Sequence, residues 1–386
     1  MVEHNNEAWD ILNNILDKIQ NNDKARKTLA ISLIIILVAS TSFFLYGLLP
    51  KKYTLSISGG GILTNRHHLV KVLQEEALKS GITLDIQPIH GSVETLKAVS
   101  HGDLDLALVQ GGLARKIPNV DHVAMLPPET LHILVKPDIA NIEGLKGKVI
   151  NMGAIGGGTK IVTKNILDFI ELEEGSDYIE TNYSDEELVN MTPEYLPDAI
   201  VSISYMPSYL ADYFVKERDY KILDIPHSQS FSFRYVWAEE SQILMSTYSV
   251  NPLVPEEDIN TIGVELELVA NSNVNPKAIS KFLGVLYNSS IENVIKQGLV
   301  EESGNSLSDF PLSAGTIAYM KRNNPAFTVE FLDRIKYWAG SAMAFISSVM
   351  VIFRWFKGKK KKSLQTLCLQ ARINRMVRPA GFKTGI

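Results

Sequence analysis

The sequence predicts an α/β domain with mainly parallel sheets, held between two membrane-spanning helices. Extended and helical segments alternate along residues 53–336, and several turns that lead from a strand into a helix contain glycine. Two long apolar runs enclose this region. Alternation of strand and helix is typical of βαβ units and therefore of parallel sheets. Apolar runs of about 20 residues are long enough to cross a bilayer.

Residues 53–112 carry the clearest signal, because they read strand, glycine turn, helix, strand, Gly-Ser turn, helix, strand. The segments, in order, are YTLSISGGG, ILTNRHHLVKVLQEEALKSG, ITLDIQPIHGS and VETLKAVSHGDLDLALVQGG. Both glycine-bearing turns would lie at the same edge of a parallel sheet, and each opens a helix. Backbone N–H groups at such turns are suited to holding a small anion. This edge is therefore expected to capture a ligand.

The remaining segments continue the alternation. Strands are expected at residues 129–137 and 145–153, and AIGGGT and a helix over residues 160–172 follow the second of them. A further strand and helix read YLPDAIVSIS and YMPSYLADYFVKE, whereas YKILDIP, FSFRYVWA and VELELVANS are expected to be extended. The amphipathic segment NPKAISKFLGVLYNSSIENVIKQG predicts one or two helices. Each half of the domain thus holds a unit of strand, glycine turn and helix.

Residues 28–49 and 337–356 are the predicted transmembrane helices. The first run has no charged residue, and its 22 residues reach about 33 Å. A cleaved signal peptide is the alternative, but the run is longer than a signal core and no clean A-x-A site follows it. The second run has aromatic residues at its edges and is followed at once by KGKKKK, which favours a span over a buried helix.

Basic residues predict the orientation and the location of the chain. They precede the first span and follow the second, so both termini are expected in the cytoplasm, with the main domain outside a cytoplasmic membrane. Residues 1–27 then form a cytoplasmic segment that fits either a short interfacial helix or a partly ordered tail. Residues 357–386 form a tail with nine Lys or Arg and no Asp or Glu. Such a tail suits anionic membrane lipids, with RNA as the alternative partner.

Charge and cysteine content narrow the class of the outer domain. Residues 28–356 hold 25 basic and 38 acidic residues, a net charge of −13, so the domain is a poor candidate for nucleic-acid binding. The one cysteine, Cys368, lies in the tail, which excludes a disulfide in the outer domain. Its stability must come from a hydrophobic core, and about 285 residues are enough for two lobes.

Three glycine turns supply candidate ligand contacts, and each also has a purely structural explanation. Gly59–Gly61 match neither G-x-x-x-x-G-K-[ST] nor G-x-G-x-x-G, so they either let a helix approach a strand or expose backbone to a ligand. In the pair Gly91-Ser92, the serine is expected to cap its helix or to face a carboxylate. Gly156–Thr159 repeat the arrangement, and Thr159 can cap the next helix.

No group of residues predicts catalysis or metal binding. The histidines lack H-E-x-x-H or comparable spacing, and no nucleophile elbow is present. His67 and His68 either touch a ligand or are exposed or packed on their helix. Asp103 and Asp105 alternate at a strand end, where two carboxylates could act in acid–base catalysis. Asp103 is better explained as a turn residue, and Asp105 as a residue at the rim of the sheet. We therefore expect no catalytic residue, no metal and no cofactor.

Six segments, taken in order, resemble the TAXI group of extracytoplasmic solute-binding proteins, which serve tripartite ATP-independent (TRAP) transporters. The resemblance covers nearly all of residues 53–356. The segments are SGGG, GSVETLKAVSHGDLDLALVQ, LKGKVINMGAIGGGT, PDAIVSISYMPSYLADYF, DINTIGVELELVANSNVNPKAISKFLGVLYN and DFPLSAGTIAYMKRNNP. A membrane segment after the last motif also occurs in one subgroup.

The resemblance implies a two-lobed type II periplasmic-binding-protein fold. The solute-binding domain would span residues 53–336, with lobe 1 at about 53–133 and 232–336 and lobe 2 at about 134–231. The chain would cross between the lobes near Leu131–Pro137 and near His227–Phe233. Two departures concern the ligand: Ile62, Leu63 and Thr64 stand where the family usually has an aromatic pair, and Gly157 stands where it has serine.

These observations favour a membrane-tethered solute-binding protein that delivers a small organic acid or amino acid to TRAP-type permease subunits. The alternative is a ligand-sensing or scaffold ectodomain that signals to a membrane partner without transport; an enzyme lacks a catalytic constellation. The residues expected to bind the ligand are Gly59, Gly60, Gly61, Thr64, Gly91, Ser92, Gln110, Gly112, Gly157, Gly158, Thr159, Ser204 and Tyr205.

Overall fold

A computed structural model describes residues 51–113, 117–302 and 308–323, together with isolated positions between residues 22 and 46. The segments predicted at residues 1–27, 28–49, 337–356 and 357–386 lie outside the described residues, apart from those isolated positions. Among the residues that are described, no helix is both long and apolar enough to span a bilayer. The chain divides into two compact units after Met320, and all strands and α-helices named below belong to the first unit.

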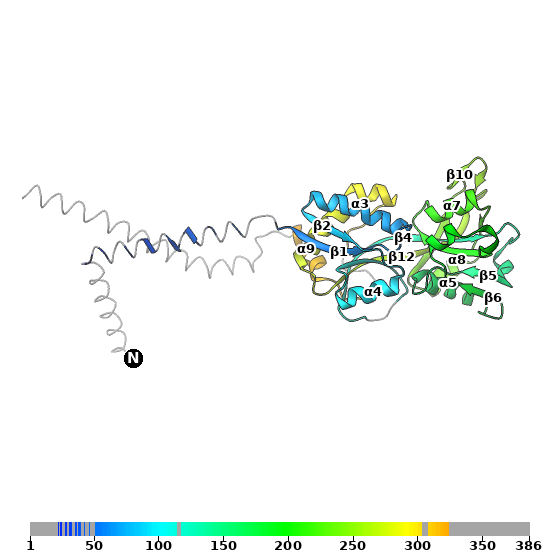
Figure 1. Ribbon diagram of the computed structural model, residues 1–386, viewed down its shortest axis with the longest axis horizontal. Helices are drawn as coiled ribbons and strands as arrows, with labels where there is room; N and C mark the ends of the chain where they lie inside the picture. The colour runs from blue at the N-terminus through cyan, green and yellow to red at the C-terminus, as the bar shows by residue number, and fades with distance from the viewer. Residues whose placement is uncertain are drawn as a thin grey trace, which may run out of the picture. The chain divides into compact units, whose positions relative to one another are not determined.

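The first lobe confirms the alternation expected for residues 53–112. Strand β1 pairs in parallel with β2 and β3, and α3 and α4 connect these strands on opposite faces of the sheet (Figure 1). Helices α9, α10 and α11 complete the lobe. The bounds are β1 Tyr53–Ser58, α3 Asn65–Lys79, β2 Ile82–Ile86, α4 Ser92–His101, β3 Leu106–Gln110, α9 Pro276–Leu286, α10 Ser289–Ile295 and α11 Ala314–Met320.

The second lobe is also built on parallel pairs, because β5 lies between β6 and β7 and runs parallel to both. Its helices cover both faces of this part of the sheet (Figure 1). The bounds are η1 Ile142–Leu145, β5 Lys148–Asn151, α5 Gly158–Phe169, β6 Tyr178–Thr181, α6 Asp185–Asn190, η2 Pro193–Tyr195, β7 Ala199–Ser204, α7 Tyr209–Glu217, β8 Lys221–Ile222, α8 Ser228–Arg234, β9 Ala238–Ile243, β10 Ser249–Val250 and β11 Leu253–Val254.

Two long antiparallel strands join the lobes, β4 (Val120–Val135) and β12 (Ile259–Asn271). The resulting sheet has the order β2-β1-β3-β12-β4-β7-β5-β6, with β8 and β9 attached to β4 and β12 (Figure 1). Side chains of β4 up to Leu126 pack in the first-lobe core and those from Leu131 pack in the second. Two α/β lobes connected by two crossings form an α/β periplasmic-binding-protein-like fold.

The second crossing lies later than the predicted His227–Phe233. On β12, Val264 packs in the second-lobe core and Leu266 in the first, so the chain changes lobes between them. Residues 232–262 therefore belong with the second lobe, where β9 pairs with the first half of β12. The segment FSFRYVWA was expected to be extended, and this is wrong for its first part, which forms α8. Helical spacing brings the rings of Phe231 and Tyr235 to a centroid distance of 4.5 Å.

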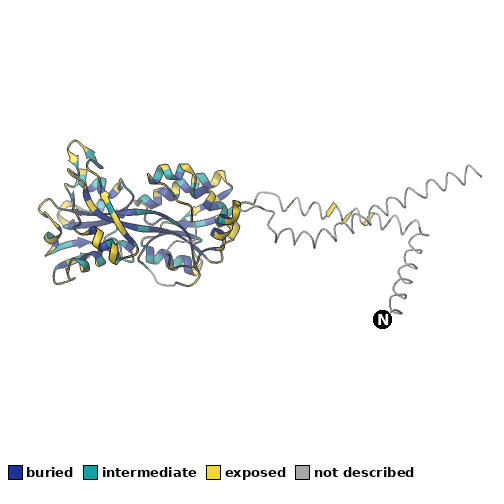
Figure 2. Cartoon of the chain, turned by 180° about the vertical axis from the view of Figure 1, so that it is seen from behind, coloured by how far each residue is buried: buried dark blue, intermediate teal, exposed yellow. Residues whose placement is uncertain are grey.

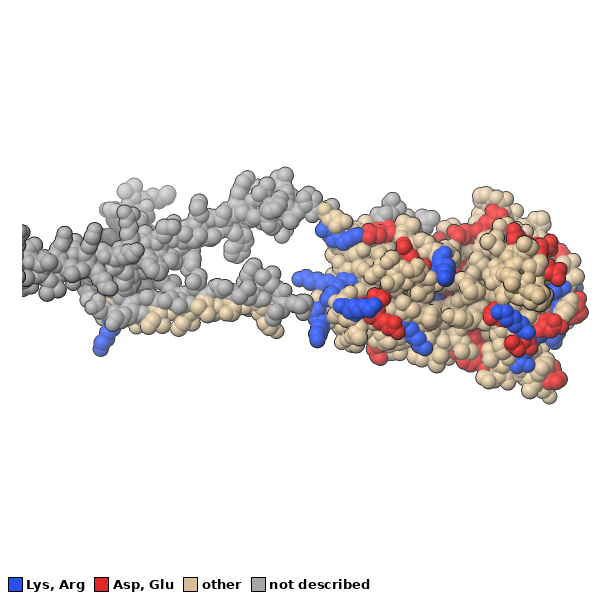
Figure 3. Space-filling view, turned by 90° about the horizontal axis from the view of Figure 1, so that it is seen from above, with Lys and Arg blue, Asp and Glu red and all other residues tan. Residues whose placement is uncertain are grey.

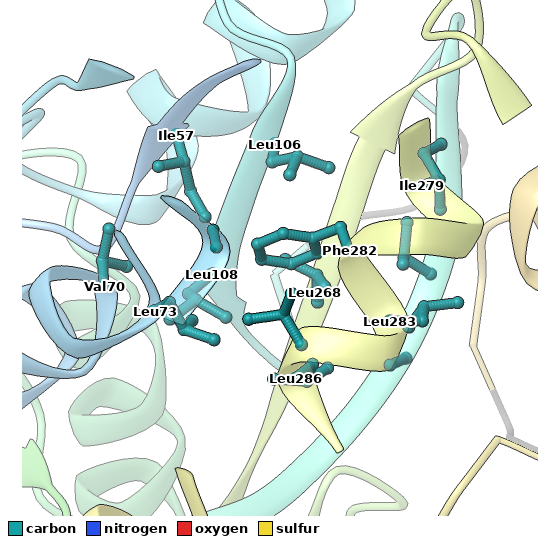
Figure 4. Close-up of a cluster of buried hydrophobic side chains, with 14 of the residues drawn as sticks. Ile57, Val70, Leu73, Leu106, Leu108, Leu268, Ile279, Phe282, Leu283 and Leu286 are labelled. Carbon is teal, nitrogen blue, oxygen red and sulfur yellow. The ribbon is translucent and has the colours of Figure 1, made fainter. Parts of the chain in front are cut away.

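Each lobe has its own hydrophobic core, and the middle of the sheet is mostly buried between the helices (Figure 2). All residues of β3 and β7 are buried, as is usual for strands covered on both faces. In the first lobe, Phe282 of α9 lies among Ile57, Leu106, Leu108 and Leu268 from the sheet (Figure 4). This ring fixes α9 on the sheet and thereby holds the strands whose ends form the cleft.

We expect Phe282→Ala to lower the free energy of unfolding by about 3–5 kcal/mol, because the side chain is fully buried and its removal leaves a cavity. Denaturant unfolding of the full-length chain measures the change. The matched control is Phe233→Ala, since Phe233 is 86% exposed and should shift stability by no more than about 0.5 kcal/mol. Equal effects of the two substitutions would contradict the packing described.

Candidate functional site

A polar cavity of about 80 Å³ lies between the two lobes, at the carboxyl ends of β1 and β3. This is the edge where parallel sheets usually bind ligands. The first lobe lines it with Gly60, Gly61, Thr64, Arg66, His90, Gly91, Ser92, Thr95, Leu108 and Gln110. The second lobe lines it with Gly153, Ala154, Gly157, Gly158, Thr159, Ser184, Asp185, Glu186, Val201, Ser202 and Ile203. We call this space the cleft cavity.

Nine of the thirteen residues predicted to bind a ligand meet at the cleft cavity, although no ligand is present to show contact, so their role stays a prediction. They come from three glycine turns that are far apart in the sequence and from the end of β3. The nine are Gly60, Gly61, Thr64, Gly91, Ser92, Gln110, Gly157, Gly158 and Thr159.

The other four predicted residues do not line the cleft cavity. A Cβ atom on Gly59 would lie 2.6 Å from the carbonyl oxygen of Arg66, so this glycine lets α3 approach β1. A Cβ on Gly112 would meet the Trp237 ring at 2.8 Å, and both residues line a separate pocket. Ser204 ends β7 opposite β4. The Tyr205 hydroxyl donates a hydrogen bond to the carbonyl oxygen of Pro127, 3.1 Å away.

Two of the predicted helix caps are placed differently. Ser92 is the first residue of α4, and the N-cap is Gly91, whose φ of 88° is readily adopted only by glycine. Thr159 is the second residue of α5, and the N-cap is Gly157. Neither hydroxyl is therefore used as a cap. Both remain on the cavity wall.

The two lobes touch around the cleft cavity, so the domain is closed. The backbone N–H of Val93, at the start of α4, donates to the carbonyl oxygen of Gly156 in the second lobe at 3.1 Å. On the other side, the Asn65 side-chain amide donates to the carbonyl oxygens of Tyr205 and Pro207 at 3.1 and 2.9 Å. The Val93 N–H group is one of the α4 N–H groups that were expected from the sequence to bind an anion, and here it bonds to the other lobe instead. The close approach of the lobes accounts for the small volume of the cavity.

A buried ion pair lies beside the cleft cavity. The Nε atom of Arg66, in the first turn of α3, is 3.2 Å from Oε1 of Glu129 on β4, and the Glu129 side chain is only 1% exposed. Burial raises the pKa of Glu129, while the Arg66 charge and the nearby Gln110 amide lower it. Sequence reasoning missed both residues; a glutamate inside the apolar strand ETLHILV was the available signal.

Two further carboxyl groups reach the cleft cavity from α6. Ser184 caps this helix in a reciprocal pair with Glu187, and the next two side chains, Asp185 and Glu186, line the cavity. Burial and then the neighbouring Glu186 charge raise the pKa of Asp185 to about 6, against the lowering effects of Arg66 and His90. His90 Nδ1 lies 3.9 Å from Glu186 Oε2 across the cleft. The sequence pattern SDEE after a strand predicts this cap, and it was overlooked.

Several polar atoms around the cleft have no hydrogen bond among the described residues. Gln110 is 2% exposed, and neither its Oε1 nor its Nε2 makes a hydrogen bond of normal geometry. Oε1 of Glu186 and Oε2 of Glu94 are also buried without one. Buried polar atoms are nearly always paired in folded proteins, and of these residues Gln110 and Glu186 line the cleft cavity, where a ligand can satisfy them.

The histidines and aspartates singled out in the sequence have other surroundings. His67 and His68 line an outer groove with Ile62 and Leu63, and burial and Lys71 lower the pKa of His67. Asp105 accepts hydrogen bonds from the N–H and hydroxyl of Ser56, which tie β3 to β1. Within residues 51–113, 117–302 and 308–323, no cluster of three or more His, Cys, Asp or Glu has the arrangement of a metal site.

Charged side chains on the outer surface are distributed unevenly. On the face shown in Figure 3, Asp and Glu are spread over the second lobe, whereas Lys and Arg gather at the far end of the first lobe. The acidic excess predicted from composition is thus visible on that face. The carboxyl groups of the cleft cavity are distinct from it because they lie between the lobes.

Comparison with known proteins gives a family match but no named relative. A model described as the NMT1-like family matches residues 66–321, well over half of the chain. A search of curated proteins returned no match.

Solved structures resemble the chain only distantly. PhnD1 from Prochlorococcus marinus in complex with methylphosphonate is 13% identical and covers 70% of this chain and 97% of its own length, with a TM-score of 0.43. The effector binding domain of QuiR in complex with shikimate is 12% identical, with coverages of 64% and 100% and a TM-score of 0.42. An ancestral arginine-binding protein bound to arginine is 13% identical, with coverages of 63% and 96% and a TM-score of 0.40.

The pH dependence of stability should report the environment of Asp185. Its raised pKa means that the folded state binds the proton more tightly than the unfolded chain, so its contribution to stability is present below about pH 4 and is lost as pH rises through about 6. Asp185→Asn removes this contribution. The free energy of unfolding of the variant, relative to wild type, should therefore rise between about pH 4 and pH 7.

Denaturant unfolding of both proteins across this pH range measures the difference. Asp138→Asn is the control. Lys148 lowers the pKa of Asp138, so the contribution of Asp138 to stability is complete above the unfolded pKa and is lost only as pH falls below about 4, and this variant should stay parallel to wild type between about pH 5 and pH 7. Stability curves that stay parallel for wild type and Asp185→Asn would show that the pKa of Asp185 is not raised in the folded state.

Proposed function

The chain belongs to the NMT1-like family, and from this premise we propose that it captures a small organic acid or amino acid between its two lobes. The observation that carries the proposal is the cleft cavity, whose walls come from both lobes and consist mainly of glycine, hydroxyl and charged residues. A pocket with several convergent polar groups is the usual form of a small-molecule site. Binding then consists of lobe closure, and no bond is made or broken.

The same proposal places the domain outside the cytoplasmic membrane, tethered by two helices, and assigns its ligand to a TRAP-type permease as in the TAXI group. It is supported by the two apolar runs, by the basic residues that flank them, and by six sequence segments that resemble that group in order. A ligand-sensing ectodomain is the alternative, and loss or retention of solute uptake on deletion of the protein separates the two.

Ligand binding should raise the melting temperature of the full-length chain in a panel of organic acids and amino acids, because a ligand that binds only the folded state stabilises it. At a concentration about 100 times Kd the gain is about 2.7 kcal/mol. If no member of such a panel stabilises the protein, solute capture is the wrong function.

Gly158→Ala should weaken that binding about 5- to 100-fold while leaving the melting temperature of the free protein unchanged. Alanine is acceptable at the first turn of α5, but its Cβ would collide with the Gln110 side chain of the other lobe, so only the closed state is strained. The control is Gly298→Ala, where a Cβ meets nothing within 4 Å. Calorimetric titration measures both, and equal affinities for the two variants would argue against closure.

The predicted membrane topology places Lys362 in the cytoplasm. A reporter enzyme that is active only in the cytoplasm should therefore be active when fused after Lys362, and one that is active only outside the cytoplasm should be inactive there. A reporter fused within an exposed turn of the second lobe, at Gly175, should behave as extracytoplasmic, because nothing lies within 4 Å of a Cβ there and an insertion is tolerated. The opposite pattern at either position would rule out the two-span arrangement.

A further inference from the structure

The charges that line the cleft cavity do not cancel. Its charged side chains are Arg66, Asp185 and Glu186. When Glu129 is ionised, Arg66 is paired with it and balances neither Asp185 nor Glu186. When burial keeps Glu129 neutral, Arg66 can balance only one of these two carboxylates. In both cases at least one carboxylate faces the cavity without a cation of its own.

His90 does not supply that cation. Its Nδ1 is 3.9 Å from Glu186 Oε2, which is too long for a hydrogen bond, and half of its side chain is exposed to water. Ion pairs open to solvent contribute little. The Oε1 atom of the same carboxylate is buried and has no hydrogen bond among the described residues. The acidic side of the cavity therefore favours a cationic hydrogen-bond donor.

A second, independent group points to a ligand in the same place. The Gln110 amide is 98% buried and lines the cleft cavity; it lies close enough to the Glu129 carboxyl group to lower the pKa of Glu129, but neither its Nε2 nor its Oε1 makes a hydrogen bond of normal geometry. Leaving such a group unpaired costs about 1–3 kcal/mol. A ligand with both donor and acceptor groups would satisfy it, whereas an apolar occupant would not.

Other parts of the wall suit a negative group. Gly158 and Thr159, in the first turn of α5, and Ser92, at the start of α4, line the cavity. The beginning of a helix favours a carboxylate because its N–H groups are free and its dipole is positive there. The cavity thus offers acidic and anion-binding groups together, a combination that matches a ligand with both charges.

We propose that the ligand carries a protonated amino group beside a carboxylate, as an α-amino acid does, and that Asp185 and Glu186 hold the amino group. This inference rests on the proposed function and narrows it, since it excludes organic acids without an amino group. A 2-hydroxy acid of the same shape would bring its carboxylate to the cavity and leave the two side chains without a cation. The volume of about 80 Å³ favours small side chains.

The test uses calorimetric titration of the full-length chain with the common amino acids, with the 2-hydroxy acids of the same side chains, and with succinate and malate. At least one amino acid should bind, and its 2-hydroxy analogue should bind at least about 100-fold more weakly, because cavity carboxylates that pair with an ammonium group reject an analogue that lacks it. If a 2-hydroxy acid or a dicarboxylate binds as tightly as the best amino acid, the inference of an amino-acid ligand is wrong, but the proposal of solute capture is supported. If no compound binds, both fall.

Glu186→Gln tests the contact itself. Its Kd for the amino acid should rise about tenfold or more, and the preference over the 2-hydroxy acid should narrow, because a neutral amide can donate to a hydroxyl group. Simple misfolding would weaken both ligands alike. The matched control is Glu187→Gln, which removes a charge from the same helical turn, keeps a residue type suited to the capping box, and does not line the cavity. Equal loss of affinity in both variants would overturn the inference.

Discussion

The antiparallel pairing of β4 with β12 is the constraint on which the rest of the domain depends. Both strands run through both lobes, so each contributes side chains to two separate cores. The register of their pairing shifts between Val264 and Leu266, opposite Pro127 and Pro128. Proline cannot donate to a ladder, so the sheet is weakest where the lobes meet. A second register shift, between Leu268 and Val269, lies within the first lobe, so the irregularity that contains the prolines is the one at the boundary between the lobes. The proposed closure would bend the sheet there.

The electrostatics of the cleft follow from the same strand. Glu129 comes directly after the two prolines and fixes Arg66, which lies at the start of the helix that follows the first glycine turn. A buried ion pair adds little net stability, but removing one partner is costly, so the pair holds the turn in place. Because Arg66 is paired with Glu129, the carboxyl groups of Asp185 and Glu186 on α6 make the net charge of the cavity lining negative.

The sequence predicted the glycine turns and the strand–helix alternation because these depend on local backbone requirements. It placed the second crossing some thirty residues early, since only the packing of Phe231 and Ala238 assigns that region to the second lobe. The strand expected at residues 129–137 begins nine residues earlier, at Val120, and includes Pro127 and Pro128, which are unusual inside a strand. Asp185 was overlooked because a helix-capping pattern has a sufficient local explanation, and only the fold brings it to the cleft.

The central claim is that the two lobes close over a small ligand by bending at the β4–β12 crossing. The most direct measurement is the distance between spin labels on Glu75 of α3 and Lys216 of α7, both exposed, after Cys368 has been replaced. The account predicts a broad, longer distance without ligand and a single shorter one at saturating ligand. A distance that is the same with and without a ligand whose binding is established would contradict it.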